Sequence, residues 1–252
     1  MTTWAVERVG GVAVATFTRA PDNFMDFRSV LELGDLLEDF GRDTERVRVV
    51  MLAGGLDGTF IDHSELSDLA RAGAGQASQE ELGSWSRALS LLETIPQPTI
   101  AAIDGLASGG GNELALACTL RVASTRARFQ QPEITAGFIP GGGGSVRLPR
   151  LIGPAHAAEV ILTGRSFSAD EAFRVNWVNT VLPAEDFRQA ALHWADSIAK
   201  HSGPALFAAK ESIVTGSRLP FHEAVSTERR LFSGLTAGLG AGGGGPVDSA
   251  AS

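Results

Sequence analysis

The sequence predicts an α/β fold, and three observations support this prediction. Continuous apolar runs such as residues 47–55 and 99–104 are typical of buried strands. Amphipathic helices separate these runs, and strands that alternate with helices pair in parallel within one sheet. The composition, with 44% hydrophobic and 20% charged residues over 252 positions, is that of an ordinary globular protein.

The N-terminal elements follow from turn signals and apolar periodicity. Residues 3–9 and 12–18 alternate or run apolar around a glycine pair, which predicts two strands joined by a tight turn. Ser29 precedes the helical spacing of VLELGDLLEDF, so a helix is expected to start there. The apolar run at residues 47–55 then predicts a buried strand that ends in glycines.

The middle of the chain continues this alternation and ends in a long loop. Residues 67–78 are rich in Ala, Gly and Ser, so a mobile loop or loose helix is expected there. Residues 129–148, FQQPEITAGFIPGGGGSVRL, hold too many prolines and glycines for a regular element. Between these loops the sequence predicts a helix at 80–94, a strand at 99–104, a helix at 112–118 and a strand at 120–125.

The C-terminal part is predicted to be mostly helical. Apolar spacing predicts one short strand at 177–182 and helices near 143–151, 154–162, 168–174, 185–201, 204–215 and 221–233. Three regions follow from these assignments. They are a core at 1–200 that holds the site, a helical region at 201–233, and a flexible Gly/Ala-rich tail at 234–252.

Composition restricts the partners of the protein. The net charge of −8 and the lack of a basic patch make nucleic acid and anionic membrane poor candidates. The N-terminus lacks the pattern of a signal peptide, and no apolar run is long enough to span a bilayer, so we expect a cytoplasmic protein. Cys118 is the only cysteine and the five histidines lack metal-ligand spacing, so no metal is expected.

Two glutamates beside glycine-rich turns are the strongest candidates for chemistry. Glu113 follows the glycines of GLASGGGNEL at a helix start, where backbone N–H groups and the helix dipole favour negative charge. For the glycines alone, close packing of helix on strand is the favoured explanation, and Glu113 in the same turn shifts the balance towards a site. Glu133 lies in the loop QPEITAGFIPGGGG, and the two carboxylates together suggest a pair for proton transfer.

The order and spacing of three segments resemble the enoyl-CoA hydratase/isomerase (crotonase) superfamily. These segments are TIAAIDGLASGGGNELALACTLRVAS, ARFQQPEITAGFIPGGGGSVRLPRLIG and ILTGRSFSADEAFRVNWVNTVLP. The similarity extends from about Val6 to Lys210. It implies a spiral core of ββα repeats, a helical C-terminal trimerisation region, and a homotrimer or homohexamer. It also implies a coenzyme A thioester as substrate, with no further cofactor.

The resemblance further implies an oxyanion hole, in which two backbone N–H groups stabilise an enolate. Gly110 matches one donor, and Ser64 in the segment FIDHSEL matches the other. Within that segment Asp62 and His63 stand where the family has alanine and glycine, and a side chain at position 63 restricts the backbone. The glycines expected to line the same site are Gly109, Gly141 and Gly142.

Glu113 and Glu133 match the positions that hold a water molecule in the hydratases of this family. The pair is expected to activate water for attack at the β-carbon, and Glu133 to supply the proton to the α-carbon. Isomerases of the family commonly keep only the second glutamate. The presence of both favours an enoyl-CoA hydratase, a lyase of fatty acid metabolism.

The C-terminus departs from the family pattern after Leu231. The charged segment and the basic final stretch that help to bind coenzyme A in the family are missing. The chain has only two lysines, and we expect Arg19 and Lys210 to contact the phosphates of the ligand. The length and branching of the acyl chain depend on residues 67–90 and are not predicted.

Three alternatives remain open. Another reaction of the family, such as isomerisation, C–C bond hydrolysis or a biosynthetic step, is favoured by His63, because an imidazole titrates near neutral pH. A degenerate, non-catalytic binder of acyl-CoA is favoured by the altered C-terminus. A serine hydrolase that uses Ser64 is the weakest alternative, because GxSxG is missing and no neighbour offers a base at a suitable angle.

Overall fold

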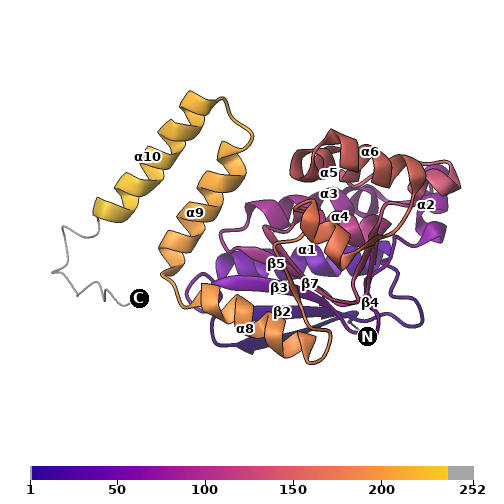
Figure 1. The fold of residues 1–252 in the computed structure, drawn as a ribbon, viewed down its shortest axis with the longest axis horizontal. Helices are drawn as coiled ribbons and strands as arrows, with labels where there is room; N and C mark the ends of the chain where they lie inside the picture. The colour runs from indigo at the N-terminus through magenta and orange to yellow at the C-terminus, as the bar shows by residue number, and fades with distance from the viewer. Residues whose placement is uncertain (1, 238–252) are drawn as a thin grey trace.

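The computed structural model describes residues 2–237, and its largest layer is a six-stranded sheet (Figure 1). The strand order is β1-β2-β3-β5-β7-β10, with β1 antiparallel to β2 and all other neighbours parallel. The parallel pairing predicted from the alternation of strands and helices is therefore confirmed. The strands are β1 (Trp4–Val9), β2 (Val12–Phe17), β3 (Val49–Gly54), β5 (Thr99–Ile103), β7 (Leu120–Ser124) and β10 (Thr180–Leu182).

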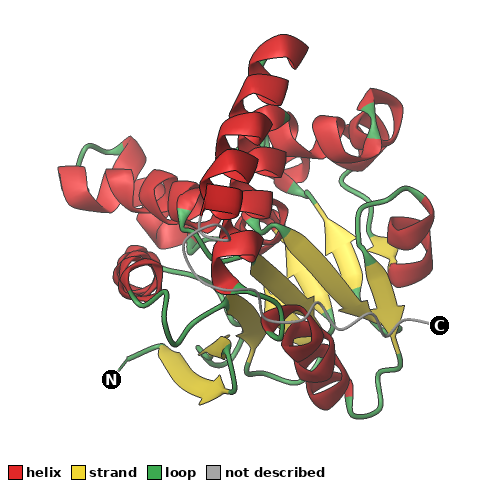
Figure 2. Ribbon diagram, turned by 90° about the vertical axis from the view of Figure 1, so that its left-hand side faces the viewer, coloured by secondary structure: helices red, strands yellow, loops and turns green. Residues whose placement is uncertain are grey.

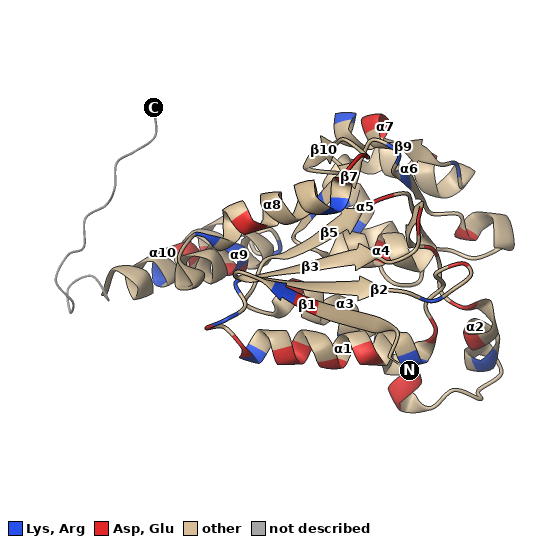
Figure 3. Cartoon of the chain, turned by 90° about the horizontal axis from the view of Figure 1, so that it is seen from below, with Lys and Arg blue, Asp and Glu red and all other residues tan. Residues whose placement is uncertain are grey.

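Helices cover both faces of this sheet because its parallel strands are apolar on both sides (Figure 2). On one face Val50 belongs to the core formed with α1 (Phe27–Arg42) and α3 (Gln79–Thr94). On the other face Met51 belongs to the core formed with α8 (Phe187–Ala199). The buried residues of α1 are all uncharged, and its many acidic and basic residues are coloured along the helix in Figure 3.

The start of one helix differs from the sequence prediction. Ser29 is not the residue that caps α1, because the Asp26 side chain accepts a hydrogen bond from the Ser29 N–H at 2.8 Å. The segment predicted to be a mobile loop or loose helix forms the short helix α2 (Leu66–Gly73) in its first part. Ser78 then begins α3 with a capping box, in which its side chain and that of Glu81 each accept a backbone N–H of the other.

A second, four-stranded sheet was not predicted, and it carries the glycine-rich turns. Its order is β4 (Thr59–Ile61), β6 (Leu106–Ser108), β8 (Arg128–Gln130) and β9 (Phe167–Ser168). Each strand has only two or three residues, too few for the alternation that identifies a strand in a sequence. The first three strands are parallel, so the segments that follow them emerge at the same edge.

Five helical segments follow or connect the strands of this small sheet. The stretch at 129–148, predicted to be irregular, contains β8, a short 3₁₀ helix and the start of a helix. The segments are α4 (Gly109–Ala117), η1 (Glu133–Ala136), α5 (Gly144–Ile152), α6 (Pro154–Thr163) and α7 (Ala169–Arg174).

The C-terminal helices α9 (Gly203–Gly216) and α10 (Phe221–Ala237) form a hairpin that extends away from the core (Figure 1). Only Gly203 and Lys210 are buried in α9, and no residue of α10 is buried. Helix α10 continues past residue 233, where the tail was predicted to begin, and the rest of the predicted tail lies outside the described residues. Within residues 2–237, no helix combines the length and apolar character needed to cross a bilayer.

Candidate active site

Three loops meet at one edge of the small sheet because the strands before them are parallel. Residues 62–65 follow β4, helix α4 follows β6, and residues 131–133 follow β8. The structure thereby gathers most of the predicted site residues at one place. The predicted site residues in these three segments are Asp62, His63, Ser64, Gly109, Gly110, Glu113 and Glu133.

The backbone at Ser64 is aligned by a parallel bridge to Met25. The Met25 N–H donates to the carbonyl of His63 at 3.0 Å, and the Glu65 N–H donates to the carbonyl of Met25 at 2.8 Å. In a trans peptide the N–H points opposite to the carbonyl, so the Ser64 N–H points away from Met25. It donates to no acceptor among residues 2–237, which leaves it available to a ligand.

The Gly110 N–H lies in the first turn of α4, where helical amides lack a partner within the helix. It too donates to no acceptor in the described part of the chain. A methyl group at Gly110 would lie 2.7 Å from Ser64 Oγ and 2.7 Å from the indole of Trp85. Gly110 and Ser64 are therefore close neighbours, and Trp85 closes one side of the space at Gly110.

The neighbouring glycine, Gly111, is needed for packing. Its N–H donates to the carbonyl of Asp62 at 2.9 Å, which ties α4 to the loop after β4. A methyl group at Gly111 would lie 2.0 Å from the carbonyl oxygen of Ile61, a backbone atom that cannot move aside. Both explanations of the glycine turn thus apply, to different residues: Gly111 allows close packing, and Gly110 presents a free N–H.

Glu113 is buried in α4, with 4% of its surface exposed. Its Oε1 accepts a hydrogen bond from the Gly144 N–H at 2.7 Å. Burial raises the pKa of Glu113 to about 7, and the nearby carboxylate of Glu133 adds to this rise, although the backbone N–H of Gly144 opposes it. A carboxyl group with a pKa near neutrality is suited to accept and return protons.

Glu133 begins η1, and burial raises its pKa as well. Its Oε1 accepts a hydrogen bond from Gln131 Nε2 at 3.1 Å, while its Oε2 is buried without a partner among residues 2–237. Gln131 Oε1 in turn accepts from Asn112 Nδ2 at 2.5 Å, so two amides connect α4 to Glu133. The unpaired Oε2 is a position where a ligand or water proton would be bound.

His63 supports the loop and does not form a triad with its neighbours. Its ring stacks on Phe24 with centroids 4.0 Å apart, and its Nδ1 lies 2.7 Å from the carbonyl oxygen of Ser64. A carbonyl oxygen only accepts, so Nδ1 carries the proton in this contact. No hydrogen bond joins His63 to the Ser64 hydroxyl in the described residues. Burial raises the pKa of the neighbouring Asp62, although a hydrogen bond with Ser108 opposes this rise.

The predicted lining glycines lie close to the two carboxylates, with one exception. A methyl group at Gly109 would lie 3.4 Å from Glu133 Oε1 and 3.1 Å from the Cβ of His63. A methyl group at Gly142 would lie 2.6 Å from Glu113 Oε2. Gly141 has open space around it. Gly109 and Gly142 therefore keep room beside the carboxylates.

The two residues predicted to bind phosphate, Arg19 and Lys210, already have partners within the chain. Arg19 forms ion pairs with Glu65 at 2.9 Å and Asp26 at 3.5 Å, so it braces the loop that carries Ser64. Lys210 is 3% exposed, and burial lowers its pKa to about 8. Its ammonium group donates, at 2.8 to 3.0 Å, to the carbonyls of Leu92, Ile95 and Gln97. Lys210 is thus held within the core, whereas Arg19 remains partly exposed beside its carboxylate partners, and phosphate binding by either residue stays a prediction.

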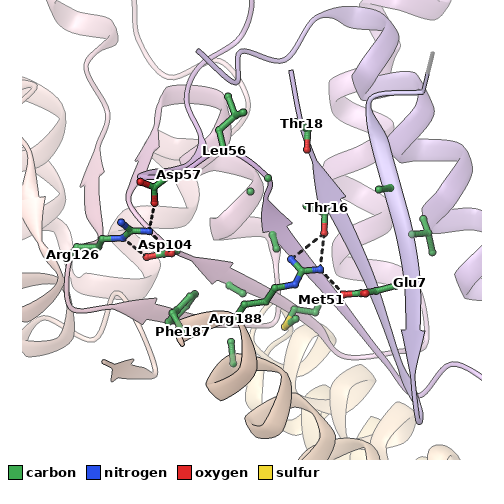
Figure 4. Close-up of a pocket in the computed structure, with 17 residues that line it drawn as sticks. Glu7, Thr16, Thr18, Met51, Leu56, Asp57, Asp104, Arg126, Phe187 and Arg188 are labelled. Atoms are coloured by element: carbon green, nitrogen blue, oxygen red, sulfur yellow. Dashed lines mark hydrogen bonds and ion pairs between the residues drawn. The ribbon is translucent and has the colours of Figure 1, made fainter. Parts of the chain in front are cut away.

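A separate pocket of about 500 Å³ lies where α8 meets the large sheet (Figure 4). Arg126 contacts Asp104 and Asp57 at its edge, and Arg188 contacts Glu7. Each guanidinium group is thus neutralised by carboxylates within the chain. The pocket contains none of the predicted site residues.

Sequence reasoning missed Gln131, Asn112, Gly144 and Trp85. Gln131 directly precedes the Pro-Glu pair, which is the one local signal that could have identified it. The other three reach the site only through the packing of α3, α4 and α5. No group of three or more His, Cys, Asp or Glu side chains among residues 2–237 is placed to hold a metal ion.

A buried carboxylate, Glu113, and a half-buried one, Glu133, stand beside two unpaired backbone N–H groups. They define a class of site, one for proton transfer next to a carbonyl oxygen. A family model described as enoyl-CoA hydratase/isomerase matches residues 7–240. The chain therefore belongs to the enoyl-CoA hydratase/isomerase family. This result confirms the resemblance to the crotonase superfamily, the fold class, and the prediction of an enzyme of this type.

Curated relatives and solved structures agree with this assignment. A short-chain-enoyl-CoA hydratase of Clostridium acetobutylicum is 31% identical over 90% of this chain and 87% of that protein. A probable enoyl-CoA hydratase of Rhizobium meliloti is 37% identical, over 93% and 90% of the two chains. The crystal structure of an enoyl-CoA hydratase from Bacillus anthracis superposes with a TM-score of 0.85 at 33% identity, covering 93% of this chain and 91% of that one.

Proposed function

We propose that the protein adds water across the double bond of a 2-enoyl-CoA thioester, with Glu113 and Glu133 as the catalytic pair. The observation that carries this proposal is the placement of two carboxylates with raised pKa values, the buried Glu113 and the half-buried Glu133, beside the free N–H groups of Ser64 and Gly110. The family assignment and the names of the relatives support a hydratase of this type.

The proposed mechanism begins with the thioester oxygen, which accepts hydrogen bonds from the Ser64 and Gly110 N–H groups. These donors stabilise the negative charge that develops on this oxygen as the enolate forms. Glu113 in its ionised form accepts a proton from a water molecule, and the oxygen of that water attacks the β-carbon. Glu133 in its protonated form then delivers a proton to the α-carbon. The net result is the addition of one water molecule.

The three alternative functions, an isomerase, a serine hydrolase and a non-catalytic binder, have less support from the geometry of the site. An isomerase would need only one of the two carboxylates, whereas here the charge of Glu133 helps to raise the pKa of Glu113, so the two lie close together. A serine hydrolase would need a base on Ser64, but His63 Nδ1 is directed to a carbonyl oxygen. A non-catalytic binder would have no need of a carboxylate oxygen such as Glu133 Oε2, buried without a partner in the described structure.

Assembly into a homotrimer or homohexamer is part of the proposal. Helix α10 of the hairpin exposes large apolar side chains, including Phe221 at 85%, Phe232 at 66% and Leu235 at 37%. Exposed apolar side chains gathered on one element are typical of an interface. The cytoplasmic location stays a prediction from the sequence.

The proposal is tested by mixing the purified protein with crotonyl-CoA and following the absorbance of the conjugated thioester. We expect the absorbance to decay and the 3-hydroxyacyl-CoA to form. A Glu45→Gln variant serves as a control, because Glu45 is exposed and distant in sequence from the site. If no decay occurs with enoyl thioesters of several chain lengths, while a known hydratase is active alongside, hydration is not the function.

A further inference from the structure

A large pocket adjoins the candidate site on the side of Glu113. Its volume is about 1160 Å³, and helices α3, α4, α5 and α9 contribute to its lining. Trp85, Leu89 and Gly142 belong to its lining and also border the site. A methyl group at Gly142 would lie 2.6 Å from Glu113 Oε2 and 3.2 Å from Leu89 Cδ1, so the pocket begins beside the catalytic carboxylate.

The position of the pocket relative to the reacting atoms identifies what it would hold. In the proposed mechanism the thioester oxygen lies at Ser64 and Gly110, and the β-carbon lies at the two glutamates. The acyl chain beyond the β-carbon therefore continues past Glu113 and towards Gly142. The coenzyme A sulfur is attached to the carbonyl carbon, on the other side of the reacting double bond. The pocket is thus placed to receive the distal part of the acyl group.

The charge of this pocket is opposite to that of the whole chain. Its lining has one acidic side chain, Glu93, against four arginines, although the net charge of the protein is −8. Glu93 is shared between two of these arginines: Arg147 contacts its Oε1 at 2.7 Å, and Arg218 contacts its Oε2 at 2.6 Å. The buried Arg121 donates to backbone carbonyls. One carboxylate therefore leaves most of this positive charge uncompensated.

Arg150 is the guanidinium group with the most freedom to bind a ligand. It is exposed on α5, and its only hydrogen bond within residues 2–237 goes to the carbonyl of Val146. An arginine presents five N–H donors in a planar fork that matches a carboxylate. Arg218, which lines the same pocket from the end of α9, keeps further donors beside its contact with Glu93.

We propose that the preferred acyl group carries a carboxylate at its distal end, which binds to Arg150 and Arg218. This inference rests on the proposed hydratase function and specifies its substrate class as a dicarboxylic 2-enoyl thioester. The pocket is somewhat larger than the usual ligand site, so a four-carbon acyl group would leave much of it unfilled. A longer acyl chain that ends in an anion would fill it and would pair with the excess guanidinium groups.

The test compares two coenzyme A thioesters of equal chain length, one ending in a carboxylate and one ending in a methyl group. We expect the wild type to turn over the carboxylate-ended ester with the higher kcat/KM. The Arg150→Gln variant should lower the ratio of the two kcat/KM values by about tenfold, because a charge-assisted hydrogen bond is lost. Arg150→Lys should retain part of the preference.

A matched control is Arg174→Gln. Arg174 is also an exposed helical arginine, and its hydrogen bond among the described residues likewise goes to the carbonyl four positions earlier, that of Asp170. This variant should keep the wild-type ratio.

The outcomes separate this inference from the hydratase proposal. Turnover of the methyl-ended ester with no preference for the carboxylate, or with a preference that Arg150→Gln leaves unchanged, overturns the inference alone. Equal losses on both esters in Arg150→Gln would show that the arginine contacts a phosphate of coenzyme A, which also overturns it. Failure of the wild type with both esters removes the proposed function and the inference together.

Discussion

The loops at the edge of the small sheet and the hairpin of α9 and α10 represent two kinds of structure within one chain. At the sheet edge, Glu113 and Gly111 are buried and held by backbone contacts to neighbouring loops. In the hairpin, α10 has no buried residue, and α9 reaches the core through Lys210 and Arg218. The difference indicates that contacts within the core fix the geometry of the site, whereas few contacts within the described chain fix the position of the hairpin.

The largest effect is expected from Gly111→Ala. The added methyl group would lie 2.0 Å from the carbonyl oxygen of Ile61 and 2.4 Å from that of Asp62, and neither backbone atom can move without opening the site. We expect a loss of several kcal/mol in the free energy of unfolding, about 3 or more, measured by thermal or denaturant melting. Gly83→Ala is the control, because its methyl group meets nothing within 4 Å. A Gly111→Ala protein as stable as the control would show that the turn is not tightly packed.

The substitution Glu113→Gln is expected to increase the free energy of unfolding above neutral pH, by an amount comparable to the loss in Gly111→Ala. Burial raises the pKa of Glu113 from 4.5 to about 7, so the folded state favours the protonated form. The stabilisation linked to this proton is complete below pH 4.5 and is lost as the pH rises through about 7. At about pH 8 the Gln variant should therefore be more stable than the wild type by about 2 to 3 kcal/mol. Equal stability of the two proteins at all pH values would contradict the raised pKa.

A smaller effect is expected from Lys210→Met, which tests the attachment of the hairpin. The substitution leaves three buried carbonyl groups at the end of α3 without their donor, at a cost of about 2 kcal/mol in the free energy of unfolding. Lys200→Met is the matched control, because Lys200 is exposed and forms one ion pair on the surface of α8. Urea unfolding of both variants provides the measurement. Equal unfolding curves would show that Lys210 does not stabilise the attachment of the hairpin to the core.

The smallest effect is expected from His63→Ala. Because His63 supports the Ser64 backbone through its Nδ1 and its stacking on Phe24, its loss should lower kcat only several-fold, or by about 1 kcal/mol. The shape of the rate profile over pH should remain that of the wild type. A pH limb that disappears in His63→Ala would instead assign a proton-transfer role to the imidazole.

The central strands of the large sheet, β2, β3 and β5, could be predicted from the sequence because they are continuous apolar runs. The strands β4, β6, β8 and β9 could not, because they have two or three residues and exist only through their pairing with each other. The start of α1 was misplaced because Ser29 and Asp26 are both good caps, and only the fold selects Asp26.

In the candidate site, too, the features that depend on tertiary contacts could not be predicted from the sequence. Glu113 and Glu133 were identified because each stands beside a glycine-rich turn in a recognisable motif. Phosphate binding by Arg19 and Lys210 stays a prediction, and their partners within the chain could not be foreseen, because a sequence shows a charge and not the groups around it. The Asn112–Gln131 link to Glu133 depends on side-chain directions that spacing does not reveal.

The most direct test of the central claim measures kcat for crotonyl-CoA hydration in Glu113→Gln, Glu133→Gln and the double variant. We expect each single variant to lose about a thousandfold, because the missing carboxylate would be required for proton transfer. Since the two groups are proposed to act as a unit, the double variant should be no more than slightly slower than the poorer single variant. Turnover near the wild-type value in either single variant, or losses that multiply in the double variant, would contradict the claim that the two carboxylates act as a unit.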